Sequence, residues 1–314
     1  MAKEPVIVTD HLTKSYGKSR GIVDLDLRVD SGDFFGFIGP NGAGKSTTIR
    51  TLLGLIAPTS GSARVLGYDI VSEKEKILQK AGYLPSEIHF YSGMKVRDVL
   101  KFSADLRKCD CGKTADELCF RLDLDPSRKV DDLSLGNRKK VGIVCAVQHH
   151  PELLILDEPT SGLDPLIQKE FFTILREENE KGSTIFFSSH ILSEVQTYCR
   201  SAALIKDGKI LLSDKVGNLE QTGTKKVTIA GAFRMEKITG LSGVTITDQE
   251  DAEAGASEPC DGSRAVGKEP GQKLSFLYQG DIRSLLTVLS GEGLTDVTIS
   301  EPSLEEIFMH YYES

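Results

Sequence analysis

The stretch of sequence that decides the fold runs from residue 39 to residue 46 and reads Gly39-Pro-Asn-Gly-Ala-Gly-Lys45-Ser46. A β-rich apolar run, Phe34–Ile38, precedes it, and the helical run Ser46-Thr-Thr-Ile-Arg-Thr-Leu-Leu follows it. Glycine adopts backbone conformations that other residues avoid, so three glycines in six residues indicate a tight turn. The sequence therefore predicts a buried strand, a glycine-rich loop and a helix in direct succession.

Such a loop directs several backbone N–H groups inward at the start of a helix, where they can meet the charge of a phosphate chain. The Lys45 ammonium is expected to reach the β- and γ-phosphates, and the Ser46 hydroxyl to complete the shell of a Mg²⁺ ion. The expected nucleotide-binding residues of this loop are Gly39, Asn41, Gly42, Gly44, Lys45, Ser46 and Thr47. A glycine turn that fits the pattern by coincidence is the alternative.

Two acids supply the complementary half of the site about 110 residues later. The run Leu153-Leu-Ile-Leu156 is continuously apolar, which is typical of a strand buried on both faces of a parallel sheet, and it ends in Asp157 and Glu158. Asp157 is expected to hold the magnesium shell and Glu158 to polarise a water molecule. This suits in-line phosphoryl transfer, which depends on positioning and electrostatics. A strand that merely ends in solvated acids is the alternative, and the upstream loop argues against it.

In the order of its motifs, the chain resembles the nucleotide-binding subunit of ABC transporters over residues 3–217. The segment Asp157-Glu-Pro-Thr-Ser-Gly-Leu-Asp164-Pro is similar to the acidic motif that runs into the loop crossing the family's dimer interface. The resemblance implies that His190, in Ser-Ser-His-Ile-Leu, contacts the γ-phosphate and positions Glu158 with its water. It implies that Tyr16, in Lys-Ser-Tyr-Gly, stacks on adenine; a core aromatic of a β-hairpin is the alternative.

One departure from the family pattern lies in its signature, ideally Leu-Ser-Gly-Gly-Gln, which reads Leu133-Ser134-Leu135-Gly136-Asn137 here. The resemblance implies that this segment heads a helix and covers the γ-phosphate bound by the other protomer. Ser134 Oγ, the Gly136 backbone and the positive end of the helix would make those contacts. Leu135 replaces the first glycine, and its added bulk is either tolerated at this position or slows closure of the site.

A second departure lies in Gly82-Tyr-Leu-Pro-Ser86-Glu87, where Ser86 stands in place of a glutamine. In the family, that glutamine senses the magnesium ion and connects it to the membrane partner. Ser86 still offers an oxygen to the metal, directly or through water, and Glu87 is a possible substitute. We expect altered coupling, with an active site.

The resemblance implies a dimer, because a complete site takes Lys45 and Glu158 from one subunit and the signature from another. ATP and Mg²⁺ are the expected cofactors, and a head-to-tail dimer with ATP between the protomers is the expected catalytic unit. A separate membrane-spanning permease is the expected partner. Its candidate docking groove is Ile88–Val99, including Phe90, Tyr91 and Met94; ordinary core packing of this segment is the alternative.

The expected fold class is α/β: a P-loop NTPase core with a RecA-like sheet, antiparallel β and helical ABC subdomains, and a small C-terminal α+β domain. The expected domains are an ATPase domain over 1–220, with its helical subdomain at about 87–148, and an accessory domain over 221–314 with an acidic loop at 248–272. The remaining expected elements are strands at Val6–Val8, Ile22–Val29, Thr184–Ser188, Lys225–Ile229, Gly243–Thr247, Lys273–Tyr278 and Leu294–Ser300, helices at Leu166–Lys181 and Ile282–Leu289, and a hairpin turn at Lys206–Lys209.

The end of the chain adds a further resemblance. The segment Glu301-Pro-Ser-Leu-Glu-Glu-Ile-Phe308-Met-His-Tyr-Tyr-Glu-Ser is similar to the accessory tail of bacterial ABC exporters of the antibiotic-resistance and multidrug type. This implies export. Fold-level analogy alone carries that inference.

Composition limits the partners and the compartment. The 314 residues carry a formal net charge of −8, and the pI near 5.4 argues against nucleic acid as a main partner. The segment Met1–Asp10 lacks the apolar core of a signal peptide, and no run of 18 apolar residues exists. We expect a cytoplasmic protein that lies on the inner face of the plasma membrane only through its permease.

Two further points stay open in the sequence. Six cysteines have no CxxC spacing, and the close pair Cys109 and Cys111 is either a metal ligand pair or a loop coincidence. The rival functions are a soluble ABC ATPase acting on ribosomes or DNA and a small-molecule P-loop kinase. The single cassette, the absence of a long coiled coil and the acidic charge argue against the first, and the signature and His190 argue against the second.

Overall fold

A computed structural model describes residues 4–17, 19–219, 224–250, 272–303 and 306–307. The chain divides into two compact units between Val216 and Gly217, four residues before the expected boundary. Most of the expected acidic loop at 248–272, Cys260 and the chain beyond Ile307 lie outside the described residues. Each unit is therefore described by itself.

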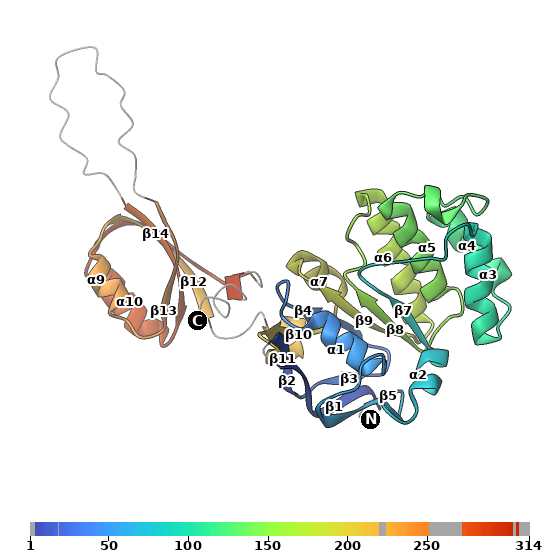
Figure 1. Ribbon diagram of the computed structural model, residues 1–314. Helices are drawn as coiled ribbons and strands as arrows, with labels where there is room; N and C mark the ends of the chain where they lie inside the picture. The colour runs from blue at the N-terminus through green and yellow to red at the C-terminus, as the bar shows by residue number, and fades with distance from the viewer. Residues whose placement is uncertain (1–3, 18, 220–223, 251–271, 304–305, 308–314) are drawn as a thin grey trace, which may run out of the picture. The chain divides into compact units, whose positions relative to one another are not determined.

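The first unit is built on a six-stranded sheet with the strand order β11-β10-β4-β9-β8-β7 (Figure 1). Its strands are β4 (Phe34–Ile38), β7 (Ala81–Leu84), β8 (Leu153–Asp157), β9 (Thr184–Ser189), β10 (Ser201–Lys206) and β11 (Lys209–Lys215). All neighbouring pairs are parallel except β10 with β11, which join through the predicted hairpin turn. The predicted α/β class is confirmed. Because β4, β7, β8 and β9 are parallel, their carboxyl ends lie along one edge of the sheet.

An antiparallel sheet contains β1 (Pro5–Tyr16), β2 (Ser19–Leu25), β3 (Arg28–Asp30), β5 (Ser60–Val65) and β6 (Tyr68–Asp69). The single strand expected at Ile22–Val29 is wrong, because β2 pairs with the second half of β1 and β3 with the first half. Asp24 adopts a left-handed φ of 53°, and the Leu27 N–H donates to Thr9 Oγ1 at 2.7 Å. These two features lie where the pairing with β1 passes from β2 to β3.

Helices α1 (Lys45–Leu52), α2 (Lys74–Lys80), α6 (Pro165–Glu180) and α7 (Leu192–Tyr198) accompany the sheets, and α8 (Val216–Leu219) begins at the division between the two units. The start of α6 is well defined. Asp164 Oδ1 accepts hydrogen bonds from the N–H groups of Leu166 and Ile167 at 3.1 Å, and Pro165 occupies the first turn. The core brings together Phe35, Phe37 and Phe186 from the central sheet; the Phe35 and Phe186 rings stack at 5.8 Å.

The helical subdomain consists of α3 (Val96–Arg107), α4 (Gly112–Arg121) and α5 (Leu135–Val147), which Figure 1 shows grouped together, with a 3₁₀ turn at Val130–Asp132. The expectation of helical character from residue 87 onward is corrected, because no described helix lies between residues 87 and 95. The apolar residues Val96, Val99 and Leu100 form the buried face of α3. This face begins at Val96, the first residue of the helix.

The second unit contains β12 (Thr224–Ala232), α9 (Met235–Thr239), β13 (Val244–Glu250), β14 (Gln272–Gln279), α10 (Ile282–Ser290) and β15 (Gly293–Ser300). The sheet is fully antiparallel with the order β13-β14-β12-β15, which is the split βαβ arrangement. Ile238 of α9 and Leu285 and Leu289 of α10 pack into one core with the buried strand residues, so both helices cover one face of the sheet (Figure 1). The extra C-terminal α+β region is as predicted, except that α9 was not expected.

Candidate functional site

The glycine-rich loop connects β4 to α1, and its shape excludes larger side chains at two positions. Gly44 has a φ of 109°, and a Cβ there would lie 3.1 Å from the Gly21 carbonyl oxygen. A Cβ on Gly39 would lie 2.5 Å from the Ile205 carbonyl oxygen, closer than real contacts allow. The loop, together with Lys45, Ser46, Thr47 and Glu158, lines a cavity of about 350 Å³. The phosphate cradle predicted at the N-terminus of α1 thus coincides with a cavity.

Lys45 lines this cavity, and its side chain is buried. Its Nζ donates to the carbonyl oxygens of Gly39 at 2.6 Å and Pro40 at 3.2 Å. The same Nζ lies 3.1 Å from Glu158 Oε1, while Glu158 Oε2 lies 3.5 Å from His190 Nδ1. The structure therefore brings together the three residues predicted to be catalytic, from α1 and from the ends of β8 and β9.

Asp157 is the last residue of β8, and its carboxylate is fully buried. Its Oδ1 accepts a hydrogen bond from Ser188 Oγ at 2.8 Å, whereas Oδ2 has no partner among the described residues. A buried carboxylate oxygen without a partner is costly unless a cation meets it. Oxygen ligands of this kind suit Mg²⁺, so the residues present fit that ion.

The backbone of Glu158 is held in a conformation that is unusual for its residue type. It has a φ of 47°, in the left-handed region. Its N–H donates to both the carbonyl oxygen and Oγ of Ser188, each at 3.2 Å. Ser188 in β9 thus contacts both acids and fixes how the chain turns out of β8. Ser188 was not predicted as a site residue, because a serine within an apolar strand has no distinctive sequence pattern.

The signature residues lie at the start of α5 and line a second cavity of about 380 Å³. Ser134 caps the helix, with its Oγ accepting from the Asn137 N–H at 3.3 Å. A Cβ on Gly136 would lie 2.7 Å from the Gly162 carbonyl oxygen, so α5 and the loop before α6 approach closely here. Leu135 is 81% exposed. This cavity shares no lining residue with the phosphate cradle.

Gly39, Asp157 and His190 do not line the cradle cavity themselves, although each is next to or in contact with a residue that does, and Tyr16 and Ser86 do not line it either. Tyr16, at the end of β1, is 47% exposed, and its ring has Lys14 Nζ 5.3 Å from the centroid. Ser86 follows β7, beside the end of β8, but its side chain does not line the cavity. Their roles toward adenine and metal stay predictions.

Lys139 is a residue of this region that the sequence analysis did not identify. Its side chain is buried, and Nζ donates to the carbonyl oxygens of Ser86 at 3.1 Å and Pro85 at 3.3 Å. Burial lowers the pKa of this ammonium, and the charges of Asp157 and Glu158 oppose that shift. Lys139 thus fastens the signature helix to the Ser86 loop. In sequence it stands in Arg138-Lys-Lys, which reads as an ordinary solvated run of charges.

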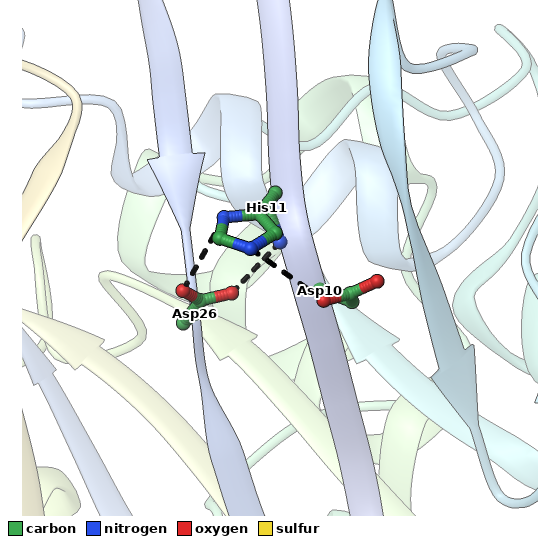
Figure 2. A group of neighbouring side chains, drawn as sticks. All are labelled: Asp10, His11 and Asp26. Carbon is green, nitrogen blue, oxygen red and sulfur yellow. Dashed lines mark hydrogen bonds and ion pairs between the residues drawn. The ribbon is translucent and has the colours of Figure 1, made fainter.

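A separate cluster of titratable groups lies on the antiparallel sheet, where the side chains of Asp10, His11 and Asp26 lie close together (Figure 2). The His11 N–H donates to Asp26 Oδ1 at 2.7 Å, and its ring Nδ1 lies 2.6 Å from Asp24 Oδ1. The hydrogen bond to Asp24, followed by the charge of Asp26, raises the pKa of His11. All four side chains are exposed, and the His11 N–H bond to Asp26 joins β1 to the segment between β2 and β3.

Comparison with known proteins identifies the family. The family model described as "ABC transporter" matches residues 22–161, which include the cradle, the signature and both acids. The bacitracin transport ATP-binding protein BcrA of Bacillus licheniformis is 35% identical over 307 residues, 97% of this chain and 96% of BcrA. The chain belongs to the ABC transporter ATP-binding proteins.

Other relatives of this ABC transporter ATP-binding protein agree with the assignment. The linearmycin resistance ATP-binding protein LnrL of Bacillus subtilis (strain 168) is 34% identical over 211 residues, 66% of this chain and 68% of LnrL. A solved structure described as an ATP binding subunit of an ABC transporter has a TM-score of 0.66 and 28% identity, covering 69% of this chain and 92% of its own. The ABC protein is accordingly an ATPase. None of its described helices is long and apolar enough to cross a membrane.

Proposed function

We propose that this ABC ATPase works as a head-to-tail dimer that binds two ATP molecules between its subunits and drives a separate membrane-spanning permease. The observation that carries the proposal is the separation of the cradle from the signature. Lys45 and Glu158 line one cavity, Ser134 and Gly136 line another, and the two have no residue in common. A second copy, turned head to tail, supplies each cradle with a signature.

Within each cradle, the N–H groups of the glycine loop and the Lys45 ammonium bind the phosphate chain of ATP. Ser46 and Asp157 hold Mg²⁺, with Ser86 as a further oxygen ligand. The ion, when bound, neutralises charge on the β- and γ-phosphate oxygens. Tyr16 stacks on the adenine.

Glu158 accepts a proton from the attacking water, and His190 holds the carboxylate in place through its contact with Oε2. The partner's signature covers the γ-phosphate with the Ser134 hydroxyl, the Gly136 N–H and the positive end of α5. The γ-phosphate then bridges both subunits. Hydrolysis removes those contacts, and the dimer opens.

The opening motion passes to the permease through the segment after Ser86. Tyr91 is 73% exposed, and its ring meets that of Phe102 edge to face at 6.2 Å. With the partly exposed Phe90 and Met94, these aromatics supply an apolar surface for a helix of the permease. The protein would lie on the cytoplasmic face of the plasma membrane through this contact.

The transport direction that we propose is export, of a compound of the antibiotic type. Support comes from the relatives named for bacitracin transport and linearmycin resistance, one of which matches almost the whole chain. The substrate contacts themselves would lie in the permease.

The Glu158→Gln variant tests this proposal. It keeps the shape of the side chain and removes the base, so we expect ATP hydrolysis to fall by about 100-fold or more while ATP binding persists. ATP should then hold the variant as a stable dimer that elutes as such in size-exclusion chromatography. The membrane protein encoded beside it should co-purify. The matched control is Glu180→Gln, an exposed position at the end of α6, which should leave hydrolysis unchanged.

A Glu158→Gln variant that binds ATP but stays monomeric at high protein concentration, with no membrane protein attached, would overturn the dimer and the permease together. A dimer without a co-purifying membrane protein would support the shared site and contradict the transport role.

A further inference from the structure

The turn between α3 and α4 brings two cysteine thiols into contact. Cys109 Sγ lies 2.7 Å from Cys111 Sγ, about 0.7 Å longer than a disulfide bond. Helix ends hold both residues: Lys108 closes α3 with a left-handed φ of 55°, the Cys109 N–H donates to the Ala104 carbonyl, and Cys111 is the N-cap of α4. The fold, and not sequence proximity alone, keeps the two sulfurs together.

Both thiols line a cavity of about 400 Å³ between α3, α4 and α5. Gln148 lines the same cavity and is only 1% exposed. Its Nε2 donates to the Leu100 carbonyl at 3.0 Å, while its Oε1 has no partner among the described residues. A buried acceptor without a donor is unfavourable. Because that oxygen is fully buried, it lies beneath the wall of the cavity and does not contact a molecule that enters it.

Metal binding, which the sequence left open for this pair, fits the site poorly. Protein zinc sites take three or four ligands from side chains. Among the described residues, the one group of three or more possible ligand side chains with donor atoms mutually within 4.8 Å is Asp10, His11 and Asp26. In the part of the chain that the structure describes, the cysteine pair has no third ligand at that distance, so its chemistry is that of two thiols.

We propose that Cys109 and Cys111 form a dithiol that exchanges with small-molecule disulfides of the glutathione type entering this cavity. The site is independent of the ATP cradle. In the first step, the Cys109 thiolate attacks one sulfur of the small disulfide, forming a mixed disulfide and releasing one thiolate. Cys111 then attacks Cys109 Sγ, closing the protein disulfide and releasing the second. The cysteines lose two electrons, the small disulfide gains them, and two protons pass to the released thiols.

The surroundings of the two sulfurs set the order of attack. Cys109 is partly exposed, whereas Cys111 is 5% exposed. Burial, together with the hydrogen bond to Cys109, raises the pKa of Cys111 to about 12 while Cys109 is a free thiol, and that hydrogen bond is lost once Cys109 is in the mixed disulfide. Cys109 is therefore the sulfur that reacts first. A disulfide that closes so short a loop gains little from chain entropy, so dithiothreitol should reverse it readily.

Mass spectrometry after trypsin tests the proposal, because cleavage at Lys108 and Lys113 places both sulfurs in one peptide, Cys109–Lys113. Cys260 is replaced by serine in every protein sample, since it lies outside the described residues. After incubation of the folded protein with glutathione disulfide, we expect this peptide to be two hydrogens lighter and to return to its reduced mass with dithiothreitol. In Cys111→Ser, the same peptide should instead keep one glutathione.

Two comparisons make the test specific. Cys119→Ser, a buried position in α4, should oxidise at Cys109 and Cys111 like its parent. The synthetic peptide Cys-Asp-Cys-Gly-Lys should close its disulfide at least about tenfold less favourably than the folded protein, because only the fold holds its sulfurs together. The proposal is overturned if the peptide in the folded protein stays reduced, if it keeps glutathione with Cys111 present, or if the synthetic peptide closes equally well.

Discussion

Gly136 shows how the absence of one side chain determines the geometry of the signature. The loop before α6 passes so close to the start of α5 that a Cβ would lie 2.7 Å from the Gly162 carbonyl oxygen. The neighbouring Leu135 points into solvent with 81% of its surface exposed. The two residues of the altered signature therefore differ: position 136 has no room for a side chain, whereas the side chain at position 135 is open to solvent.

Replacing Gly136 with alanine is expected to displace the loop before α6 and the Ser134 cap. Displacement of a catalytic group by about 1 Å can cost about 100-fold in rate, so ATP hydrolysis should fall by roughly that factor. ATP affinity of the monomer should not change, because the cradle shares no lining residue with this cavity. Steady-state hydrolysis and equilibrium ATP binding measure the two effects.

Leu135→Ala is the matched control for that substitution. It removes only exposed atoms, so hydrolysis should be retained or should rise if the leucine slows closure. Equal losses in both variants would contradict the close approach of Gly136 and Gly162 as the cause.

Single residues were predictable where the chemistry restricts the residue type. The glycines, Lys45, Asp157 and Glu158 stand in spacings that few other functions require, and the structure places them at one edge of the sheet. Lys139 and Ser188 were not predictable, because their roles arise from contacts between elements far apart in sequence. A lysine such as Lys139 is ordinary on a solvated helix face, and a serine such as Ser188 is ordinary within a strand. Neither residue type alone therefore indicates a role in the site.

At the scale of elements, α4 is fastened to α6 through one arginine. Arg121 Nε lies 2.6 Å from Glu170 Oε1, and its two terminal nitrogens meet the two oxygens of Glu177 at 2.6 and 2.9 Å. The guanidinium lowers the pKa of Glu177, and Glu177 in turn raises the pKa of Arg121. This paired geometry connects the helical subdomain to a helix of the core.

Replacing Arg121 with methionine should lower the free energy of unfolding at pH 7 by about 1 kcal/mol, the scale of a partly exposed ion pair. The folded pKa of Glu177 lies below the unfolded value, so the pair stabilises the fold above the unfolded pKa. That contribution is lost as the pH falls through the folded pKa. Urea unfolding of parent and variant between pH 7 and pH 3 should therefore converge at the acid end.

Arg176→Met, at an exposed position on α6, is the control and should shift unfolding little at any pH. A difference between parent and Arg121→Met that persists undiminished at pH 3 would show that lost packing, and not the ion pair, causes the destabilisation.

Continuously apolar strands were predictable, and the short helix α9 was not. The runs that became β4, β8 and β9 are buried throughout, and their pattern indicated this directly. Helix α9 has five residues, too few for a helical period to appear. The division of the run 22–29 into two strands depends on Thr9, which lies on another strand, so the local pattern contained no sign of it.

At the scale of the whole molecule, the chain consists of two units with separate cores. The first holds every predicted ATP-site residue, and the second is a split βαβ sheet with its own buried cluster. Ligand binding stabilises only the part of a protein that forms the site. The two units should therefore respond differently to nucleotide.

Differential scanning calorimetry should show two transitions, and Mg²⁺ with ADP should raise only one of them. At a ligand concentration about 100-fold above Kd, the stabilisation should be about 2.7 kcal/mol. A truncated chain, residues 1–219, should keep the transition that responds to nucleotide. A single transition that shifts as a whole, or a truncated chain that does not fold, would show that the two units depend on each other.

The order of the motifs along the chain made it predictable that the ATP-site residues gather in one place, because parallel strands have their carboxyl ends at a common edge of the sheet. The sheet order itself was not predictable from the sequence. It follows from strand pairings such as β10 with β4, which join segments more than 160 residues apart.

The ion pair between Lys45 and Glu158 has a consequence for when the enzyme becomes active. One ammonium serves two anionic partners, the carboxylate at 3.1 Å and any phosphate that enters the cradle. An arriving phosphate chain competes for that ammonium and releases Glu158 from it. In the function proposed above, the substrate itself would release the base, and a cradle without phosphate keeps the Glu158 carboxylate paired with Lys45.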